Sequence, residues 1–581
     1  MLKKKEKIID IMNNPSMKLF SMLCGYLLLV LVLYTVFQFI KFENCLGIIQ
    51  ILSVLIPILV YVYHSNKEKI KENIIIISIY LVLLLVVPFI WGYIPDLSCD
   101  GNMYHKVAVA NIKNGWNPLY ETTKEFENRN PNVVKVADES DTDLWIEHYP
   151  KGTWIVGASL YEMTGNIESG KTTSLFLLVM LLIISFNCLR SIIDKKWACF
   201  ISLLICANPV MIAQIFTYYI DGLMGICFVI ELLLLFLIKP MEKQQPIIWI
   251  SLAAICSLYT NIKFTGLLCS GVLAAVFYFY WFFKHKKEKK FWLRFRNITL
   301  HFIVVFVTAI FLVGANSYIK NTVEHKNPLY PLFGDDKVDI ITSQQPKSFK
   351  NKSSFEKFII STFSKTDNIM EFMDKEPELK LPYQIYKSEI NSVYVTDTRI
   401  GGFGPLYAMI LIITLINLPF VLYLFIKNEK KNIKYIALPA IAVVLTMILV
   451  GEYWWARYVP QFYLFPLGTL VLSIYTSKYR KNTFISKLST IVLTLVIIIN
   501  ICLFLPGIRT QLRAFIHASR ELKYLKEQEN PKIQLVIKDL AGHYYNLKDN
   551  NIEYTIEKTL TVENSEYTYQ WNFFIERETE R

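Results

Sequence analysis

Asp100 is the residue of this chain whose type and position best suit acid–base chemistry. It follows a long apolar run, and Tyr104 and Ala108 come four and eight positions after it. In a helix these three positions share one face, which we expect to lie near the membrane surface. A carboxylate that is partly desolvated there can act as a general base. The same position also suits an aspartate that caps the helix beside Gly101, and caps are commoner than catalytic bases.

Three further charged residues stand where apolar runs end. Asp221 lies in QIFTYYIDGLMG, Lys263 in YTNIKFTG and Arg457 in EYWWARYVPQF. A charge at membrane depth is costly, so it normally faces a cavity and marks a functional path. Lysine and arginine at the headgroup level suit a lipid-linked phosphate, which arginine can bind through two hydrogen bonds. The alternative, in which these side chains simply reach toward the aromatic interface, stays open.

Histidines and carboxylates of the first polar segment raise the question of a metal. His105 and His148, together with Asp96, Asp100 or Glu147, are ligand types that suit a divalent cation. No tight ligand spacing supports such a site, so two solvated histidines are the favoured interpretation. We therefore assign no metal ligands from the sequence and leave a divalent cation open as a cofactor.

Asparagines open the second long polar segment. In NSYIKNTVEHKNPLYPLFG, the side chains of Asn316, Asn321, Asn327 and Tyr330 can hydrogen-bond a polyhydroxylated ligand. The Asn-Pro and Tyr-Pro steps of the same stretch also form turns without any ligand. Both interpretations remain open at this point.

The composition indicates what must position these residues. The chain has 581 residues, 53% hydrophobic and 19% charged, with a net charge of +13 and a mean hydropathy of +0.35. A soluble protein carries about 25% charged residues, so a soluble multi-domain enzyme is excluded, and we predict an all-α polytopic membrane protein. A spanning helix needs about 20 apolar residues. About thirteen runs qualify: 18–41, 45–64, 73–94, 173–190, 197–215, 223–238, 247–261, 264–283, 298–316, 403–426, 435–451, 459–476 and 484–505.

The distribution of lysine and arginine predicts an orientation. The short basic loops all fall on one side if the count of thirteen holds, and that side is the cytoplasm. The N-terminus is then cytoplasmic and the C-terminus outside. The excess positive charge is accordingly a topology signal, not the basic surface of a nucleic-acid-binding protein. Richness in Lys, Ile and Asn is typical of a low-GC bacterium, so we expect a bacterial inner (cell) membrane.

Three polar segments are long enough to fold outside the membrane, namely 95–172, 317–402 and 506–581. We expect function in the first two, because long loops that contain aromatic residues and Gly-Pro punctuation are usually functional. The third resembles a small α/β tail, with a charged helical stretch near 510–528 and strand-like runs such as IQLVI.

Two details of these segments can be checked against a structure. Residues 153–165 follow the chain-breaking Pro150 and Gly152, and they are too short and polar to span, so they predict an interfacial helix. Cys45 and Cys99 both fall on the outer side and can pair, although no spacing rule supports a disulfide.

A succession of short motifs runs in order through residues 73–476: DGNMYHKVAVANIKNGWNPLY, YPKG, YYIDG, NIKFTG, NPLYPLFG, GGFGP and WWARY. Their order along a multispan frame resembles the polyprenyl-phosphate-dependent glycosyltransferases of the GT-C superfamily, which includes protein O-mannosyltransferases and the aminoarabinose transferase of lipid A. The resemblance implies a GT-C-like catalytic module over 73–505, two additional helices over 1–72 and an outer tail over 506–581. Gly101 departs from the family, where a Glu commonly follows the aspartate.

The resemblance also implies a reaction. A sugar would pass from a polyprenyl-phosphate donor to a hydroxyl of a glycan, lipid or protein on the outer face, with inversion. Asp100 would be the base, with Asp96 as the alternative acid. Basic residues would hold the donor phosphate, namely Arg457 and, as further candidates, Lys263 and Arg399. Further candidate substrate contacts are Tyr104, His105, Tyr149, Asp221, Asn316, Asn327 and Tyr330.

Other classes of multispan protein remain as alternatives. A lipid-linked glycan polymerase or O-antigen ligase relies on arginines of an outer loop, whereas the large second loop holds only Arg399. A transporter would show internal repeats with broken midplane helices; we see none, and Glu231 is the main mid-span charge. A non-catalytic membrane scaffold would not require Asp100.

Overall fold

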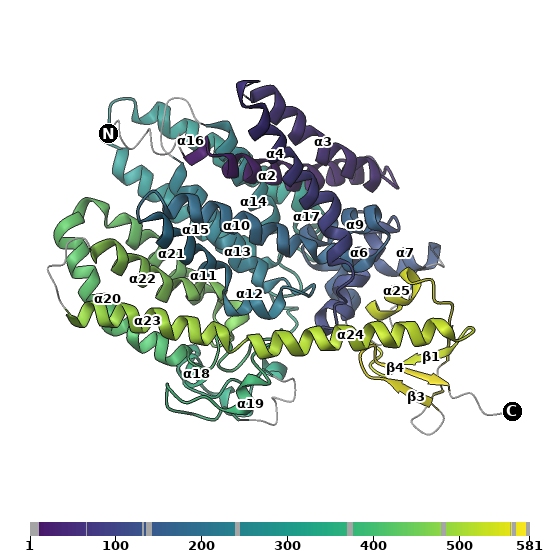
Figure 1. The fold of residues 1–581 in the computed structure, drawn as a ribbon. Coiled ribbons are helices and arrows are strands. Elements are labelled where there is room, and N and C mark those ends of the chain that lie inside the picture. The colour runs from purple at the N-terminus through teal and green to yellow at the C-terminus, as the bar shows by residue number, and fades with distance from the viewer. Residues whose placement is uncertain are drawn as a thin grey trace.

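The computed structural model is mostly helical, with one small sheet near the C-terminus (Figure 1). It describes residues 11–65, 67–130, 133–134, 142–238, 245–368, 376–477, 484–557, 559–560 and 565–576. Within these residues, eight helical stretches are long and apolar enough to cross a membrane. They are Pro15–Phe39, Leu46–His64, Ile70–Trp91, Ile167–Leu189, Phe264–His285, Phe291–Asn316, Tyr407–Glu429 and Lys487–Glu527.

The other five predicted spans are also helical, but each helix is shorter than 18 residues. They correspond to α11 (Lys195–Cys206) with α12 (Pro209–Gln214), α13 (Asp221–Leu237), α14 (Pro246–Thr260), α21 (Lys434–Val450) and α22 (Leu464–Thr476). The predicted run 197–215 is divided because Asn208 caps a new helix with Pro209 as its first residue. All thirteen predicted runs are therefore helical in the described residues, and eight of them belong to helices long and apolar enough to cross a membrane.

The helix α2 (Pro15–Phe39) lies inside the bundle. It packs against α3 (Leu46–His64), α4 (Ile70–Leu81), α10 (Thr173–Leu189) and α14. Its residues Phe20, Val30 and Leu31 are fully buried. Thirteen of its 25 residues are buried, so α2 contributes much of its apolar surface to the core of the bundle.

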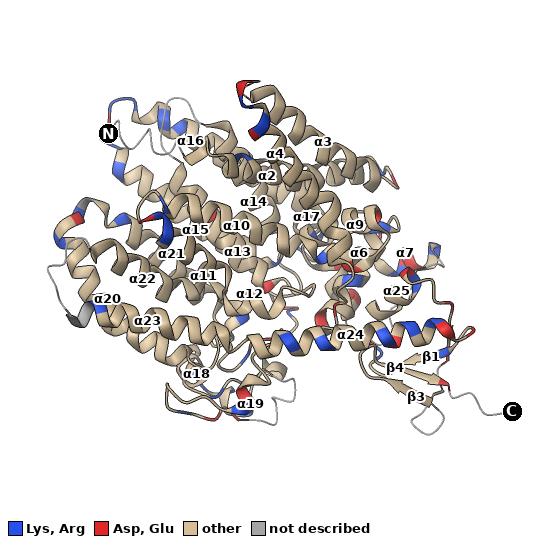
Figure 2. Ribbon diagram, viewed as in Figure 1, with Lys and Arg blue, Asp and Glu red and all other residues tan. Residues whose placement is uncertain are grey.

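The charges mark the ends of these elements. Figure 2 shows that Lys, Arg, Asp and Glu gather at helix ends and connecting segments, whereas the middles of the bundle helices carry few of them. This distribution is the one that membrane helices need, since a charge in hydrocarbon is costly. Several basic loops that predicted the orientation, including 1–10, 239–244 and 478–483, lie outside the described residues.

The first polar segment folds into short helices. A π-helical turn, Gly101–His105, leads into α6 (Lys106–Lys113), followed by α7 (Thr123–Arg129), α8 (Thr142–His148), α9 (Gly152–Thr164) and the 3-10 helix Ile167–Thr172. The helix α9 matches the predicted element at 153–165. Its residues from Gly152 to Tyr161 are buried, and it packs against α6 and the 3-10 helix.

The second polar segment holds α17 (Tyr318–His325), α18 (Ser354–Thr362) and α19 (Lys387–Ile390), linked by loops. Two isolated backbone bridges, Ser364 to Leu379 and Asp367 to Ile400, tie the later part of the segment together. They bring the end of this segment back toward the bundle, where α20 (Tyr407–Glu429) begins.

The C-terminal tail is a small α/β unit, as predicted. After α23 (Phe484–Cys502), α24 (Leu505–Glu527) extends from the bundle to the tail (Figure 1). A four-stranded sheet follows in the order β2 (Thr555–Ile556), β1 (Lys532–Leu535), β4 (Phe573–Glu576) and β3 (Ser565–Thr568). The β1 and β2 strands are parallel and are joined through α25 (Gly542–Asp549), while β4 is antiparallel to both of its neighbours.

The tail is docked onto the first polar segment. Its apolar core, which includes Trp571 and Phe573, also contacts Leu97, Cys99 and Met103. Burial of apolar side chains from both parts stabilises their association. All ten cysteines fall within the described residues and are free thiols, so Cys45 and Cys99 do not form the disulfide that was considered.

Candidate active site beside the first polar segment

Arg457 is the centre of a cluster of charged side chains. It belongs to a short 3-10 turn, Ala456–Tyr458, that precedes α22. Its Nη1 lies 3.3 Å from Oδ2 of Asp100 and 3.8 Å from Oδ2 of Asp221, and its Nε lies 3.2 Å from Oδ1 of Asp397. One guanidinium therefore contacts carboxylates from three separate segments of the chain.

Lys263 extends this cluster on one side. Its Nζ lies 3.0 Å from Oδ1 of Asp221, the first residue of α13, and 4.6 Å from the ring centre of Tyr458. Lys263 itself precedes α15 (Phe264–His285) at its N-cap position. Asp221 is thus shared between two cations, which offsets the cost of burying its charge.

Arg399 extends the cluster on the other side. Its Nε lies 2.6 Å from Oδ2 of Asp397, and its guanidinium stacks 4.0 Å from the ring centre of Trp455. Its remaining nitrogens donate to the backbone oxygen and the side chain of Gln344. Because Arg399 is buried and bonded on several sides, it is a poorer candidate for donor binding than Arg457.

The charges of this cluster balance. Among the described residues it contains three carboxylates and three cations: Asp100, Asp221, Asp397, Lys263, Arg399 and Arg457. Asp100 is the most accessible member, with 25% of its side chain exposed, compared with 11% for Arg457 and 5% for Asp221. A ligand that enters the cluster from solvent therefore meets Asp100 first.

Asp100 does not cap its helix. It stands at the N-cap position of the Gly101–His105 turn, yet within the described residues its carboxylate makes no capping hydrogen bond. It instead accepts a hydrogen bond from the Tyr104 hydroxyl at 3.5 Å and pairs with Arg457. The structure thus differs from the capping interpretation because the long-range ion pair turns the carboxylate away from the helix backbone.

Aromatic side chains form one wall of the cluster. The Arg457 guanidinium lies 4.5 Å from the ring centre of Trp455 and 5.4 Å from that of Tyr219, and the rings of Tyr104 and Tyr149 meet edge to face at 6.3 Å. Burial, with the charge of Asp100, raises the pKa of Tyr104 well above its usual value. Tyr104 therefore stays a neutral hydroxyl that donates to the carboxylate and does not compete for protons near neutral pH.

Asp96 lies in a different environment from Asp100. Its side chain is fully buried, with one oxygen accepting from the backbone N–H of Ser98 at 2.8 Å and the other from that of Tyr218 at 2.8 Å. A carboxylate held by two backbone groups joins segments of the chain and has little access to a substrate. This placement favours Asp100 over Asp96 as a base.

A buried network of ion pairs connects the residues on either side of the Asp100 turn. Glu168 lies 2.6 Å from Nζ of Lys106 and 2.5 Å from Nζ of Lys171, and Lys106 also donates to the backbone oxygen of Asp96 at 2.9 Å. Asn546 of the tail donates to Glu168 at 2.7 Å. Sequence reasoning missed this network; its only local signal is the spacing of three between Glu168 and Lys171.

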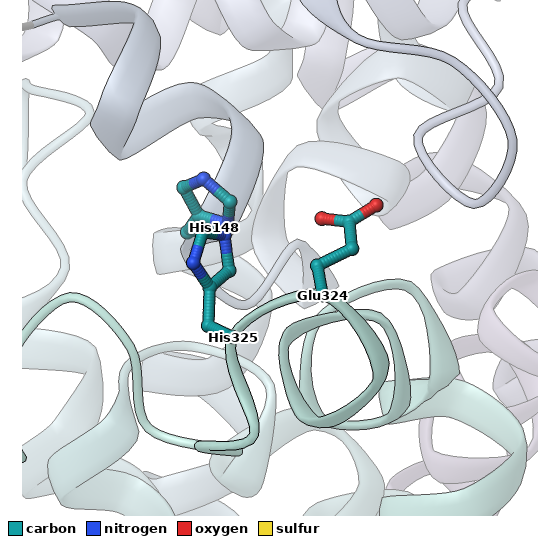
Figure 3. Close-up of side chains that lie close together, drawn as sticks. All are labelled: His148, Glu324 and His325. Carbon is teal, nitrogen blue, oxygen red and sulfur yellow. The ribbon is translucent and has the colours of Figure 1, made fainter.

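His105 and His148 do not form one metal group. Nδ1 of His105 accepts a hydrogen bond from the Trp154 indole at 2.7 Å, and burial lowers the pKa of His105 to about 3. His105 is therefore a neutral, packed side chain. Among the described residues, His148 instead forms a group of potential metal ligands with Glu324 and His325 (Figure 3).

The candidate substrate-binding residues of the second polar segment lie away from the Arg457 cluster, and each contacts another residue of the same segment. Asn316 is buried and accepts from the hydroxyl of Ser317 at 3.1 Å. Asn327 closes a turn by accepting from the backbone N–H of Leu329 at 3.0 Å. Tyr330 stacks on His325 with ring centres 3.7 Å apart. The turn interpretation of this stretch fits these contacts, and the structure does not bring the three residues to the Arg457 cluster.

Asp397 is a member of the cluster that sequence reasoning missed. It is 3% exposed and lies between the two guanidinium groups of Arg399 and Arg457. Its spacing of two from Arg399 was the available signal, but a DTR tripeptide in a long polar loop is too common to be informative by itself.

No model of a known protein family matches this chain, and no curated protein matches it at a significant level. The chain is a multi-helix protein with eight long apolar helices in its described part.

Proposed function

We propose that this protein is a membrane glycosyltransferase that moves a sugar from a polyprenyl-phosphate donor to a hydroxyl of a glycan, lipid or protein. The observation that carries the proposal is the 3.3 Å approach of the Asp100 carboxylate to the Arg457 guanidinium in a partly exposed cluster. A base and a phosphate-binding cation are the two groups that such a transfer needs side by side. The motif order over residues 73–476 supports the same assignment by resemblance.

In the proposed reaction, Asp100 accepts the proton of the acceptor hydroxyl as that oxygen attacks the anomeric carbon. The bond between the anomeric carbon and the phosphate oxygen breaks, and polyprenyl phosphate leaves with the electron pair. Attack from the face opposite the leaving group inverts the anomeric configuration. Tyr104, whose hydroxyl donates to Asp100, keeps the carboxylate turned toward the cluster.

Arg457 is the proposed donor site. A phosphate that binds it would compete with Asp100 for the same Nη1, so donor binding would release the carboxylate for its role as base. Lys263 lies on the far side of Asp221 and adds a second positive charge within reach of an anionic group. Developing charge on the leaving phosphate is then stabilised by cations that are already in place.

The direct test is the composition of the cell envelope. Surface glycolipids and glycoproteins of a deletion strain are compared by mass spectrometry with those of the same strain that expresses the wild-type protein or Asp100→Asn. Loss of one sugar in the deletion and in Asp100→Asn supports the transferase. Loss of chain length alone would support a polymerase, and an unchanged envelope would contradict the proposal.

A further inference from the structure

A second group of potential ligands lies at the junction of the two polar segments, and the proposed transfer reaction does not use it. It consists of His148 at the end of α8 together with Glu324 and His325 at the end of α17 (Figure 3). One ligand atom from each of the three lies within 4.8 Å of the other two. Two imidazoles and a carboxylate are a ligand set that zinc commonly takes in proteins.

The hydrogen bonds of Asn321 determine which nitrogen of His148 carries its proton. The amide nitrogen of Asn321 donates to the backbone oxygens of His148 at 3.2 Å and of Tyr330 at 3.0 Å. Its amide oxygen therefore faces Nδ1 of His148, 2.8 Å away, and accepts a hydrogen from it. Nε2 is then left with a free lone pair, which is the form of histidine that binds metals, held by a hydrogen bond from the other ring nitrogen.

The second imidazole is held by packing. The ring of His325 stacks on Tyr330 with ring centres 3.7 Å apart and planes 5° from parallel, and Tyr330 also meets His148 edge to face at 4.8 Å. Glu147 adds a second carboxylate, because its Oε2 lies 4.0 Å from Nε2 of His148. Its other oxygen is anchored by the backbone N–H and hydroxyl of Thr123.

We propose that His148, Glu324 and His325 bind a Zn²⁺ ion that clips α8 to α17, with Glu147 available as a further oxygen ligand. Ligands 2.0–2.1 Å from a tetrahedral zinc lie about 3.3 Å from one another. Glu324 is exposed and can rotate to reach that spacing, while the buried His148 and the stacked His325 supply the fixed positions. The proposed zinc site is structural and not catalytic, because the three ligands and Glu147 together fill all four coordination positions of a tetrahedral zinc.

The proposed zinc site is connected to the Arg457 cluster by the backbone segment that carries His148 and Tyr149. Tyr149 follows His148, its ring meets that of Tyr104, and its backbone oxygen accepts a hydrogen bond from Ser317 at 2.9 Å. A metal at His148 would therefore hold in place the segment that carries one aromatic wall of the cluster. Binding of the metal itself does not depend on the transferase proposal.

The test is metal binding by the purified full-length protein in detergent micelles. The protein is stripped with a chelator, dialysed against Zn²⁺ and desalted, and bound zinc is measured by plasma mass spectrometry. We expect about one equivalent in the wild type and at least a tenfold loss of affinity in Glu324→Gln/His325→Ala. Both substitutions are at exposed positions, so the variant should elute as the folded protein. His517→Ala, which changes an exposed histidine of α24, is the matched control and should retain the wild-type equivalent.

A second variant tests the orienting hydrogen bond. Asn321→Ala removes the acceptor at Nδ1 of His148, and loss of such a partner weakens metal binding by about 10- to 100-fold. Zinc should also raise the melting temperature of the wild type and of His517→Ala, but not that of Glu324→Gln/His325→Ala. A wild type that retains no zinc after desalting, or a double variant that retains as much as the wild type, would overturn the proposal.

Discussion

The Nη1 atom of Arg457 lies 3.3 Å from Oδ2 of Asp100, although the two residues are 357 positions apart in the chain. Asp221 and Asp397 contact the same guanidinium. Three carboxylates around one arginine would repel one another strongly by themselves. Lys263 and Arg399 offset that repulsion, so the six charges of the cluster balance.

Replacement of Asp100 tests the proposed base. We expect Asp100→Asn to lower the rate of sugar transfer by at least about 100-fold, because a general base contributes roughly 10²- to 10⁴-fold. The protein should still reach the membrane at its normal level, since the side chain is partly exposed. Glu162→Gln, at an exposed carboxylate of α9, is the control and should transfer normally. Full activity in Asp100→Asn would exclude this role.

Replacement of Arg457 tests donor binding. We expect Arg457→Lys to raise the donor KM and to lower kcat/KM by about 10- to 100-fold, since lysine keeps the charge but loses the two-point geometry for phosphate. Arg457→Ala should be worse, because it removes the charge and leaves the buried Asp221 and Asp397 with one cation each. Steady-state kinetics with a varied donor provide the measurement. As a control, Arg129→Ala, which removes an exposed ion pair with Glu121, should change neither constant. An unchanged donor KM in Arg457→Lys would contradict donor binding and would indicate that Arg457 only contacts the aromatic residues at the membrane interface.

Asp397 should matter for stability. We expect Asp397→Asn to destabilise the protein by about 3 kcal/mol, because it leaves the buried Arg399 with one charged partner fewer. Thermal unfolding in detergent, followed by a thiol-reactive dye, measures the loss. Asp335→Asn, at an exposed position of the same segment, should unfold at the wild-type temperature. Equal melting temperatures for the two variants would show that the ion pair between Asp397 and Arg399 makes no net contribution to the free energy of unfolding.

The tail docking should depend on pH through Asp549. Its carboxylate accepts hydrogen bonds from the Tyr161 hydroxyl and the Ile167 backbone, both at 2.6 Å, and burial raises its pKa to about 6. The folded state then binds more protons than the unfolded state between about pH 4 and pH 6. Stability therefore falls as the pH rises through this window, by about 3 kcal/mol. Melting curves from pH 4 to pH 7 should show this slope in the wild type, and a shallower one in Asp549→Asn.

Close contact between the tail and the Asp100 turn gives a further test. A Cβ added to Gly542 would lie 2.8 Å from the Cα and the backbone oxygen of Asn102. We expect Gly542→Ala to push α25 away from the turn, to cost about 1–3 kcal/mol and to make the tail easier to cleave by protease. Gly271→Ala is the control, since a Cβ there meets no atom within 4 Å. Identical cleavage rates for both variants would contradict the tight docking.

Much of the architecture follows from local composition. A run such as residues 18–41 has no stable alternative to a membrane helix, because backbone groups in hydrocarbon must be bonded within the segment. The tail was predictable for a similar local reason, as its charged helical stretch and short strand-like runs differ from the long apolar runs before them. The division of the run 197–215 was harder to predict, since the cap formed by Asn208 and Pro209 had to outweigh a continuous apolar pattern.

The site divides between sequence and tertiary structure in the same way. The sequence alone made Asp100, Asp221, Lys263 and Arg457 candidates, because each is a charge at the end of an apolar run, where burial is costly. Only the tertiary structure decided that these residues meet, that Asp397 lies among them, and that Asp96 is buried among backbone donors. Ion pairs between segments hundreds of residues apart depend on packing of whole helices, and no local pattern encodes that distance.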